Sequence, residues 1–143
     1  MGTALSLKNI RNQEKTFLTQ KQLELNDEIT IECEIPKENK KILTIGLVTG
    51  NSQPDPKNVA CQVDVKEDRT VEVKSVNKGT IKQHPIDPTK IDGTIISTKF
   101  IVRQSKNVVD IHLDESHLAS VPVLDVSSIR FISVKVVRRR EKY

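Results

Sequence analysis

Apolar and polar residues alternate with a period of two along most of the chain. The clearest example is 28–35, where Ile29, Ile31 and Cys33 are separated by acidic or hydroxyl side chains. The same alternation returns at 59–66, 71–74 and 109–113, and runs of β-branched residues occupy 42–49, 93–103 and 129–137. Successive side chains of a strand point to opposite faces, and β-branched residues favour strands over helices. Each of these segments therefore predicts a β-strand.

Turn-forming residues separate these segments. Proline, glycine, asparagine and serine gather at 36–40, 50–58, 77–79, 84–93 and 105–107. Strands about ten residues apart with such punctuation are typical of an antiparallel sandwich or barrel. We therefore predict an all-β fold, a two-sheet antiparallel β-sandwich. Only 120–128 leaves room for a single helical turn, which Pro122 disfavours.

The chain length and the reach of the strand pattern indicate one domain. The chain has 143 residues, and a domain typically has about 100–200. We assign 16–137 to the β-sandwich domain, because the strand pattern fills this range. Residues 1–15 are polar and lack the alternation, so they predict a flexible lead-in, and 138–143 form a basic C-terminal tail. Aromatic residues make up only 3% of the chain, so the core must consist of Ile, Val and Leu.

Two cysteines, Cys33 and Cys61, occupy apolar positions of alternating segments. A free cysteine behaves there as a small hydrophobic residue, and we expect both to be reduced core residues. A disulfide between them is the alternative, because sequence does not reveal how closely their Cα atoms approach.

No segment has the features of a signal peptide or a membrane span. The N-terminus lacks an apolar run after a basic start. No window approaches the ~20 apolar residues that cross a bilayer. We therefore expect no membrane insertion and a cytoplasmic or nuclear location, with secretion without a leader left open.

The net charge of +4 is spread over a surface of mixed sign, except at the C-terminal end. The basic patch there consists of Lys135, Arg138, Arg139, Arg140 and Lys142. We interpret it as a solvated tail. Nucleic-acid binding is the alternative, and it is disfavoured because the patch lacks the interleaved aromatic residues that stack on bases.

No pattern of catalytic, metal-ligating or cofactor-binding residues stands out. The sequence contains none of the motifs GxxxxGK[ST], GxGxxG, HExxH or CxxC, so phosphate, dinucleotide and zinc binding have no motif behind them. None of His84, His112 and His117 has a close histidine or cysteine partner in sequence. We expect each to be solvated or locally hydrogen-bonded, and we predict no enzyme activity, no metal and no cofactor.

Five segments carry a family resemblance through their order and spacing: 23–36, 59–64, 92–102, 108–118 and 124–129. The first reads Leu-Glu-Leu-Asn-Asp-Glu-Ile-Thr-Ile-Glu-Cys-Glu-Ile-Pro, and the second Val-Ala-Cys-Gln-Val-Asp. In this order the chain resembles the galectin family, the β-galactoside-binding lectins that fold as a two-sheet jelly roll. The resemblance covers roughly 17–137 and implies the same sandwich that the alternation predicts.

The resemblance places a sugar-binding groove on the strand at 59–66, where the residues differ from the family pattern. The family motif His-Phe-Asn-Pro-Arg falls on 62–66, so Gln62, Asp64 and Lys66 stand in place of its histidine, asparagine and arginine. An ammonium group cannot reproduce the planar fork of a guanidinium, and a carboxylate cannot donate as an amide does.

The downstream half of the family pattern is altered as well. The asparagine, tryptophan and glutamate of the family fall on Lys74, Ile81 and His84. The chain has no tryptophan, so the apolar face of a galactose has no indole to lie on. Every principal sugar-binding position therefore departs from the family pattern.

These departures decide the predicted function. We predict a non-enzymatic galectin-like module that serves protein–protein interaction and has lost β-galactoside binding, as a monomer or homodimer. The first alternative is a lectin for a β-galactoside or another, including an anionic, glycan, with Gln62, Asp64, Lys66, Lys74 and His84 on one concave face. The second is nucleic-acid binding through the basic C-terminus.

Overall fold

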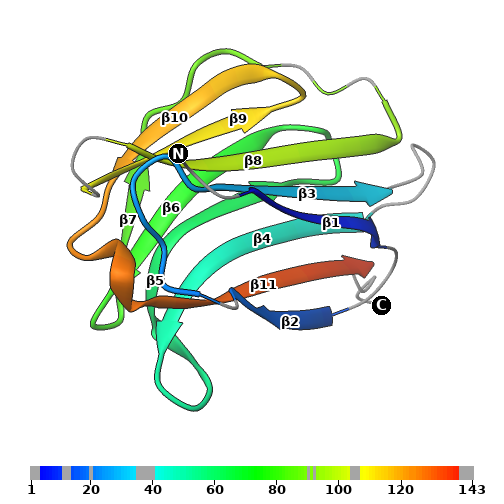
Figure 1. Ribbon diagram of the computed structural model, residues 1–143. Helices are drawn as coiled ribbons and strands as arrows, with labels where there is room; N and C mark the ends of the chain where they lie inside the picture. The colour runs from blue at the N-terminus through cyan, green and yellow to red at the C-terminus, as the bar shows by residue number, and fades with distance from the viewer. Residues whose placement is uncertain are drawn as a thin grey trace.

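The structure is a computed structural model that describes residues 4–10, 14–19, 21–34, 41–89, 91, 93–103 and 107–138. Two β-sheets pack face to face (Figure 1). The five-stranded sheet has the strand order β1–β3–β8–β9–β10. Its strands are β1 (Ala4–Ile10), β3 (Glu28–Glu34), β8 (Ile95–Arg103), β9 (Val108–Leu113) and β10 (Ser116–Pro122).

The six-stranded sheet has the order β2–β11–β4–β5–β6–β7. Its strands are β2 (Glu14–Leu18), β11 (Ile129–Arg138), β4 (Lys41–Gly50), β5 (Pro54–Val65), β6 (Val71–Asn77) and β7 (Thr80–His84). All neighbouring strands are antiparallel except β1 and β3, which pair in parallel. The predicted all-β, two-sheet sandwich is thereby confirmed.

The core lies between the sheets and follows the predicted alternation. Every second residue of β3 and of β9 is buried, because successive side chains of a strand point to opposite faces. Ile31, Ile45 and Ile132 are fully buried and belong to one aliphatic cluster, to which Phe100 adds an aromatic ring. Burial of such side chains stabilises the fold by roughly 1.5–3 kcal/mol each.

Both cysteines lie in this core as free thiols. Burial raises the pKa of Cys33 to about 12, and it raises the pKa of Cys61 as well. Since the thiolate is the reactive form of cysteine, both side chains act as small core residues in the folded protein.

The N-terminal boundary of the domain differs from the predicted one, whereas the C-terminal boundary lies close to it. Strand β1 and the start of β2 lie within 1–15, for which we expected a flexible lead-in. Leu5 and Leu7 explain β1, because they pair with Ile29 and Ile31 of β3 and pack against the core. At the other end, β11 reaches Arg138, close to the expected boundary.

The structure describes only two residues of the basic patch, Lys135 and Arg138. Lys135 is an exposed residue of β11, and Arg138 is the last residue of that strand. Arg139, Arg140 and Lys142 lie outside the described residues, so nucleic-acid binding through this patch stays a prediction.

The connection from β10 to β11 contains a single 3-10 turn, η1 (Val126–Ser128), inside the segment where we allowed one helical turn. The Asp125 carboxylate accepts a hydrogen bond from the backbone N–H of Ser127 and thereby caps this turn. Within the described part of the chain, no helix is long and apolar enough to cross a membrane.

Candidate functional site

The predicted sugar-site residues of β5 lie on the outer face of the six-stranded sheet, which is the face turned away from the five-stranded sheet. Cys61, Val63 and Val65 are buried in the core between the sheets, so Gln62 and Asp64 point outward. Lys74 of β6 lies directly opposite Gln62 and shares this face.

These outward side chains bond to one another. The Gln62 amide donates from Nε2 to Asp64 Oδ1 over 3.0 Å, and the Lys74 ammonium lies 2.8 Å from Asp64 Oδ2. Asp64 itself is only 7% exposed. Both oxygens of this nearly buried carboxylate are therefore engaged by its neighbours.

A second ion pair lies beside the first at the end of the hairpin between β5 and β6. Lys66 Nζ donates to Glu72 Oε1 over 2.8 Å. This hydrogen bond from Lys66 to Glu72 and the charge of Glu72 raise the pKa of Lys66. Both lysines that we considered for an anionic group thus already have a carboxylate partner.

A hollow of about 480 Å³ covers this network, and we call it the polar groove. It is lined by Thr44, Gln62, Asp64, Lys66, Glu72 and Lys74, with Glu67 and Asp68 at the hairpin between β5 and β6. Its lining side chains carry four carboxylates against two ammonium groups. The polar groove is therefore acidic by count of charges.

Ile81 and His84 of β7 do not join the polar groove. Ile81 pairs with Val76 on the outer face, is 65% exposed and lies beyond the groove lining. His84 pairs with Val73, a core residue, and is only 8% exposed, so it points to the opposite side of the sheet. The expectation that His84 shares one face with Gln62 and Lys74 is not met.

Sequence reasoning missed two residues on the outer face. Gln83 lies directly opposite Lys74 and is exposed. Thr44 of β4 lies directly opposite Asp64 and lines the polar groove. The period of two was the available signal for Gln83, because counting from Ile81 in steps of two reaches 83 and not 84.

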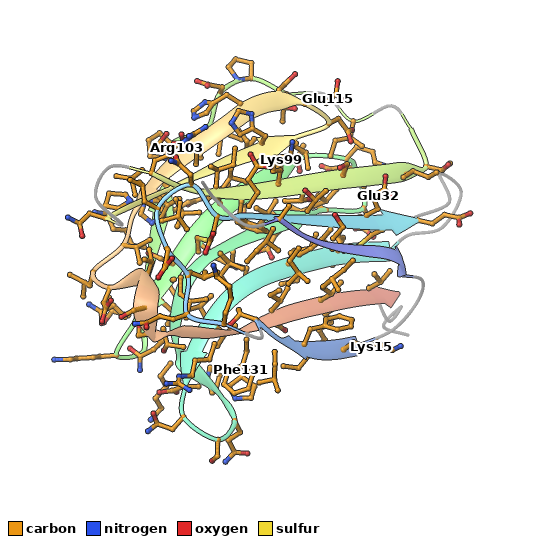
Figure 2. The ribbon with its side chains drawn as sticks, in the orientation of Figure 1. Lys15, Glu32, Lys99, Arg103, Glu115 and Phe131 are labelled. Carbon is orange, nitrogen blue, oxygen red and sulfur yellow. The ribbon has the colours of Figure 1, made fainter. Side chains whose placement is uncertain are left out.

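The outer face also has an apolar end. Val48, Val59 and Phe131 form a small buried cluster of their own, with Val76 packed against it. Figure 2 shows Phe131 pointing away from the five-stranded sheet, on the side of the hairpin between β4 and β5. A bulge between Val59 and Cys61 changes the register of β5 and lets Val59 pair with Val48 on this face.

A second and larger hollow, of about 660 Å³, lies along β7 and the last residues of β6, and we call it the end groove. It is lined by Ser75, Lys82, His84, Val123, Leu124 and Asp125. The last three belong to the β10–η1 connection, which passes beside β6 and β7 in Figure 1. Ser75 and Lys82 pair across the strands on the same side as His84.

A hydrogen-bonded pair, Ser75 and His84, forms one wall of the end groove. Ser75 Oγ lies 2.8 Å from His84 Nε2. Burial, and next to it the positive charge of Lys82, lowers the pKa of His84. The imidazole is therefore neutral near pH 7 and has donor and acceptor nitrogens.

A further hydrogen-bonded series of side chains lies along β9 and β10, at one edge of the five-stranded sheet. His117 Nδ1 lies 2.6 Å from Asp87 Oδ2 and His117 Nε2 lies 3.0 Å from Ser120 Oγ, while that hydroxyl donates to Asp110 over 2.6 Å. The order resembles an Asp-His-Ser triad, but the serine proton is directed to Asp110 and away from the histidine. In the hydrogen bond between Ser120 and His117 the serine oxygen is therefore the acceptor, so His117 does not take the serine proton as the base of a triad would.

His112 and His117 come together although we found no close partner for either in sequence. Their rings lie edge to face with centroids 5.5 Å apart, because the residues pair directly across β9 and β10. Burial, and after it the charge of His117, lowers the pKa of His112. The sequence signal for this pairing was the turn at Asp114–Glu115, since a two-residue turn sets the register of a hairpin. In the structure both residues of this turn have positive φ. Among the described residues, no group of three or more His, Cys, Asp or Glu is arranged to hold a metal ion.

Comparison with known proteins identifies the architecture. No protein-family model and no curated protein sequence matches the chain. Among solved structures, sheep galectin-11 in complex with glycerol matches with a TM-score of 0.64 and 13% identity, over 93% of this chain and 97% of that one. Toad ovary galectin in complex with thio-digalactose matches with a TM-score of 0.61 and 17% identity, over 89% and 95%. The chain has a galectin-like fold.

The low identity of these matches limits the likeness to the fold. On this fold the chain has two grooves with different lining residues, the polar groove on the outer face and the end groove beside β7. Of the positions that the resemblance assigned to sugar, His84 lines the end groove and Ile81 lines neither groove. The other four line the polar groove: Gln62, Asp64, Lys66 and Lys74.

Proposed function

We propose that this galectin-like domain is a non-enzymatic binding module whose outer face takes a protein segment and has lost β-galactoside binding. One observation carries the proposal. Gln62 and Lys74 both bond to the carboxylate of Asp64, so a sugar hydroxyl would have to displace one of these partners to be recognised by Asp64. Each polar group left without a partner costs about 1–3 kcal/mol. A millimolar ligand supplies only about 4 kcal/mol in total.

The apolar side of sugar recognition is also missing. Ile81 is exposed at the position that the family resemblance gives to a stacking tryptophan, and an aliphatic side chain lacks the flat aromatic surface on which a pyranose lies. The excess of carboxylates in the polar groove suits a basic, extended segment of a partner. Such a segment would contact Asp68 and Glu72 at the hairpin between β5 and β6 while the Asp64–Lys74 pair stays intact.

Titration with lactose tests the loss of sugar binding. We expect no saturable signal in calorimetry or in chemical shifts up to about 10 mM, a concentration that reveals binding of only ~3 kcal/mol. In parallel, a lysine-rich extended peptide should bind with an affinity that falls with salt and with Asp68→Asn, while a glutamate-rich peptide of equal length should not. Saturable lactose binding would refute the proposal.

A glycan is the second candidate function, and the fold favours it, because toad ovary galectin was solved with thio-digalactose. A glycan array that includes sulfated and sialylated sugars would test it. A hit that disappears in Lys66→Ala or Lys74→Ala would assign the polar groove to a sugar. The carboxylate partners of both lysines weaken the case for an anionic sugar.

A further inference from the structure

The end groove has cations that are not committed to a partner. Neither the Lys78 nor the Lys82 ammonium group forms an ion pair or a hydrogen bond with a described residue, although both residues line the groove. The Asp125 carboxylate, which also lines it, accepts hydrogen bonds from the backbone N–H and the hydroxyl of Ser127. The groove therefore differs from the polar groove, where each lysine has a carboxylate within 2.8 Å.

The same groove has an apolar wall. Leu124 is 86% exposed, which is unusual for a leucine, and it stands beside Pro122 and Val123 in the groove lining. Val123 packs partly against the core and holds this wall in place. Its backbone N–H also donates to the Asn107 carbonyl over 2.8 Å. A ligand that covered Leu124 would remove apolar surface from water.

The remaining wall supplies neutral polar groups. The half-buried Ser75 and the buried His84 are hydrogen-bonded, with Ser75 Oγ 2.8 Å from His84 Nε2. A serine hydroxyl keeps free lone pairs when it makes one hydrogen bond, so this wall can accept or donate without adding a second charge. A hollow of about 660 Å³ is also within the volume range of small-molecule sites.

From these three walls we infer that the end groove binds a small amphipathic carboxylate, with the anionic group at Lys82 and Lys78 and the apolar body against Leu124. The site is independent of the proposed function, because the end groove and the polar groove share no lining residue. A charge-assisted contact favours the anion over a neutral ligand of the same shape. The apolar wall favours a hydrocarbon body over a bare inorganic anion.

A pair of matched probes tests this inference on the whole chain. 4-Phenylbutyrate and 4-phenylbutyramide have the same apolar body and differ in charge. Titration followed by two-dimensional NMR should show the carboxylate binding at least ~10-fold more tightly than the amide. The amide signals of Ser75, Lys82 and Leu124 should shift, while those of Thr44 and Asp64 should not.

Two variants measure how much the cationic wall and the apolar wall of the end groove each contribute to the affinity for the probes. Lys82→Gln should weaken the carboxylate about 10-fold and leave the amide unchanged, whereas Leu124→Ser should weaken both probes about equally. Lys15→Gln is the control, because Lys15 is an exposed lysine of β2, at the other edge of the same sheet (Figure 2). Equal affinity for the two probes, no saturable shift up to about 10 mM, or shifts at Thr44 and Asp64 instead would each overturn the inference.

Discussion

The polar groove and the end groove share no lining residue and use their charges in opposite ways. In the polar groove, Asp64 is bonded by Gln62 and Lys74, and Lys66 is paired with Glu72. In the end groove, Lys78 and Lys82 have no ion-pair partner among the described residues. Polar groups that already satisfy one another, as at Asp64, stabilise the fold, whereas cations without such a partner can bind an anionic ligand.

The outer face has an apolar end, and two of its residues, Val59 and Val76, also line the end groove. A substitution at Gly50 tests how this apolar end packs. Gly50 has φ of 152°, and a Cβ there would overlap the carbonyl oxygen of Gln53 and lie 3.1 Å from Phe131. Gly50→Ala should therefore lower the free energy of unfolding by at least about 2–3 kcal/mol.

Gly93→Ala is the matched control, because a Cβ at Gly93 meets nothing closer than 3.6 Å and its φ is not positive. It should change stability by less than about 0.5 kcal/mol in urea unfolding. Equal effects of the two substitutions would contradict the packing that we describe at Phe131. Loss of the Asp64–Lys74 contact in Gly50→Ala would show that the two ends of the outer face are coupled.

Neutralising one lysine from each groove sharpens the comparison. Lys74→Gln leaves the nearly buried Asp64 without its ammonium partner and should cost about 1–2 kcal/mol of unfolding free energy. Lys82→Gln removes an exposed charge that has no ion-pair partner among the described residues and should change stability by less than about 0.5 kcal/mol. Chemical denaturation of both variants measures the difference, and equal costs would erase the contrast between the grooves.

The smallest expected effect is a pH dependence in the end groove. Burial and Lys82 lower the pKa of His84 below its ordinary value of 6.5. Because the pKa of His84 is lower in the folded state, the contribution of neutral His84 to the free energy of unfolding is complete above pH 6.5. This contribution is lost as the pH falls from 6.5 through the lowered pKa of the folded state. NMR titration of the His84 ring should give a midpoint below 6.5. In Lys82→Gln the midpoint should rise. An unchanged midpoint would show that the charge of Lys82 does not act on the His84 ring.

The sequence was sufficient for the sandwich, because alternation reports burial one strand at a time. It predicted the strands at 59–66 and 109–113, and these form with the expected faces. It missed β1, since Leu5 and Leu7 become apolar partners only when β3 lies beside them. The alternation of Leu5 and Leu7 with Ser6 and Lys8 is too brief to establish a strand by itself, so this edge strand depends on such distant contacts.

The candidate site was predictable only in part. Alternation was enough to bring Gln62, Asp64 and Lys74 to one face, and the structure places them together. His84 was assigned to this face from the family motif, although the period of β7 puts it on the other. The end groove had no sequence signal, because its walls come from β6, β7 and the β10–η1 connection, which meet only in the folded chain.

The central claim is that the side chains of the polar groove are bonded to each other and not available to a sugar. A double-mutant cycle on Asp64 and Lys74 tests it most directly, because it isolates the ion pair at the centre of this network. Unfolding free energies of the native protein, Asp64→Asn, Lys74→Gln and the double variant give the coupling energy of the two side chains. We predict a coupling of at least about 1 kcal/mol, since the ammonium and carboxylate lie 2.8 Å apart and Asp64 is nearly buried. A coupling near zero would show that the groove residues are not committed to each other, and the argument against sugar binding there would fail.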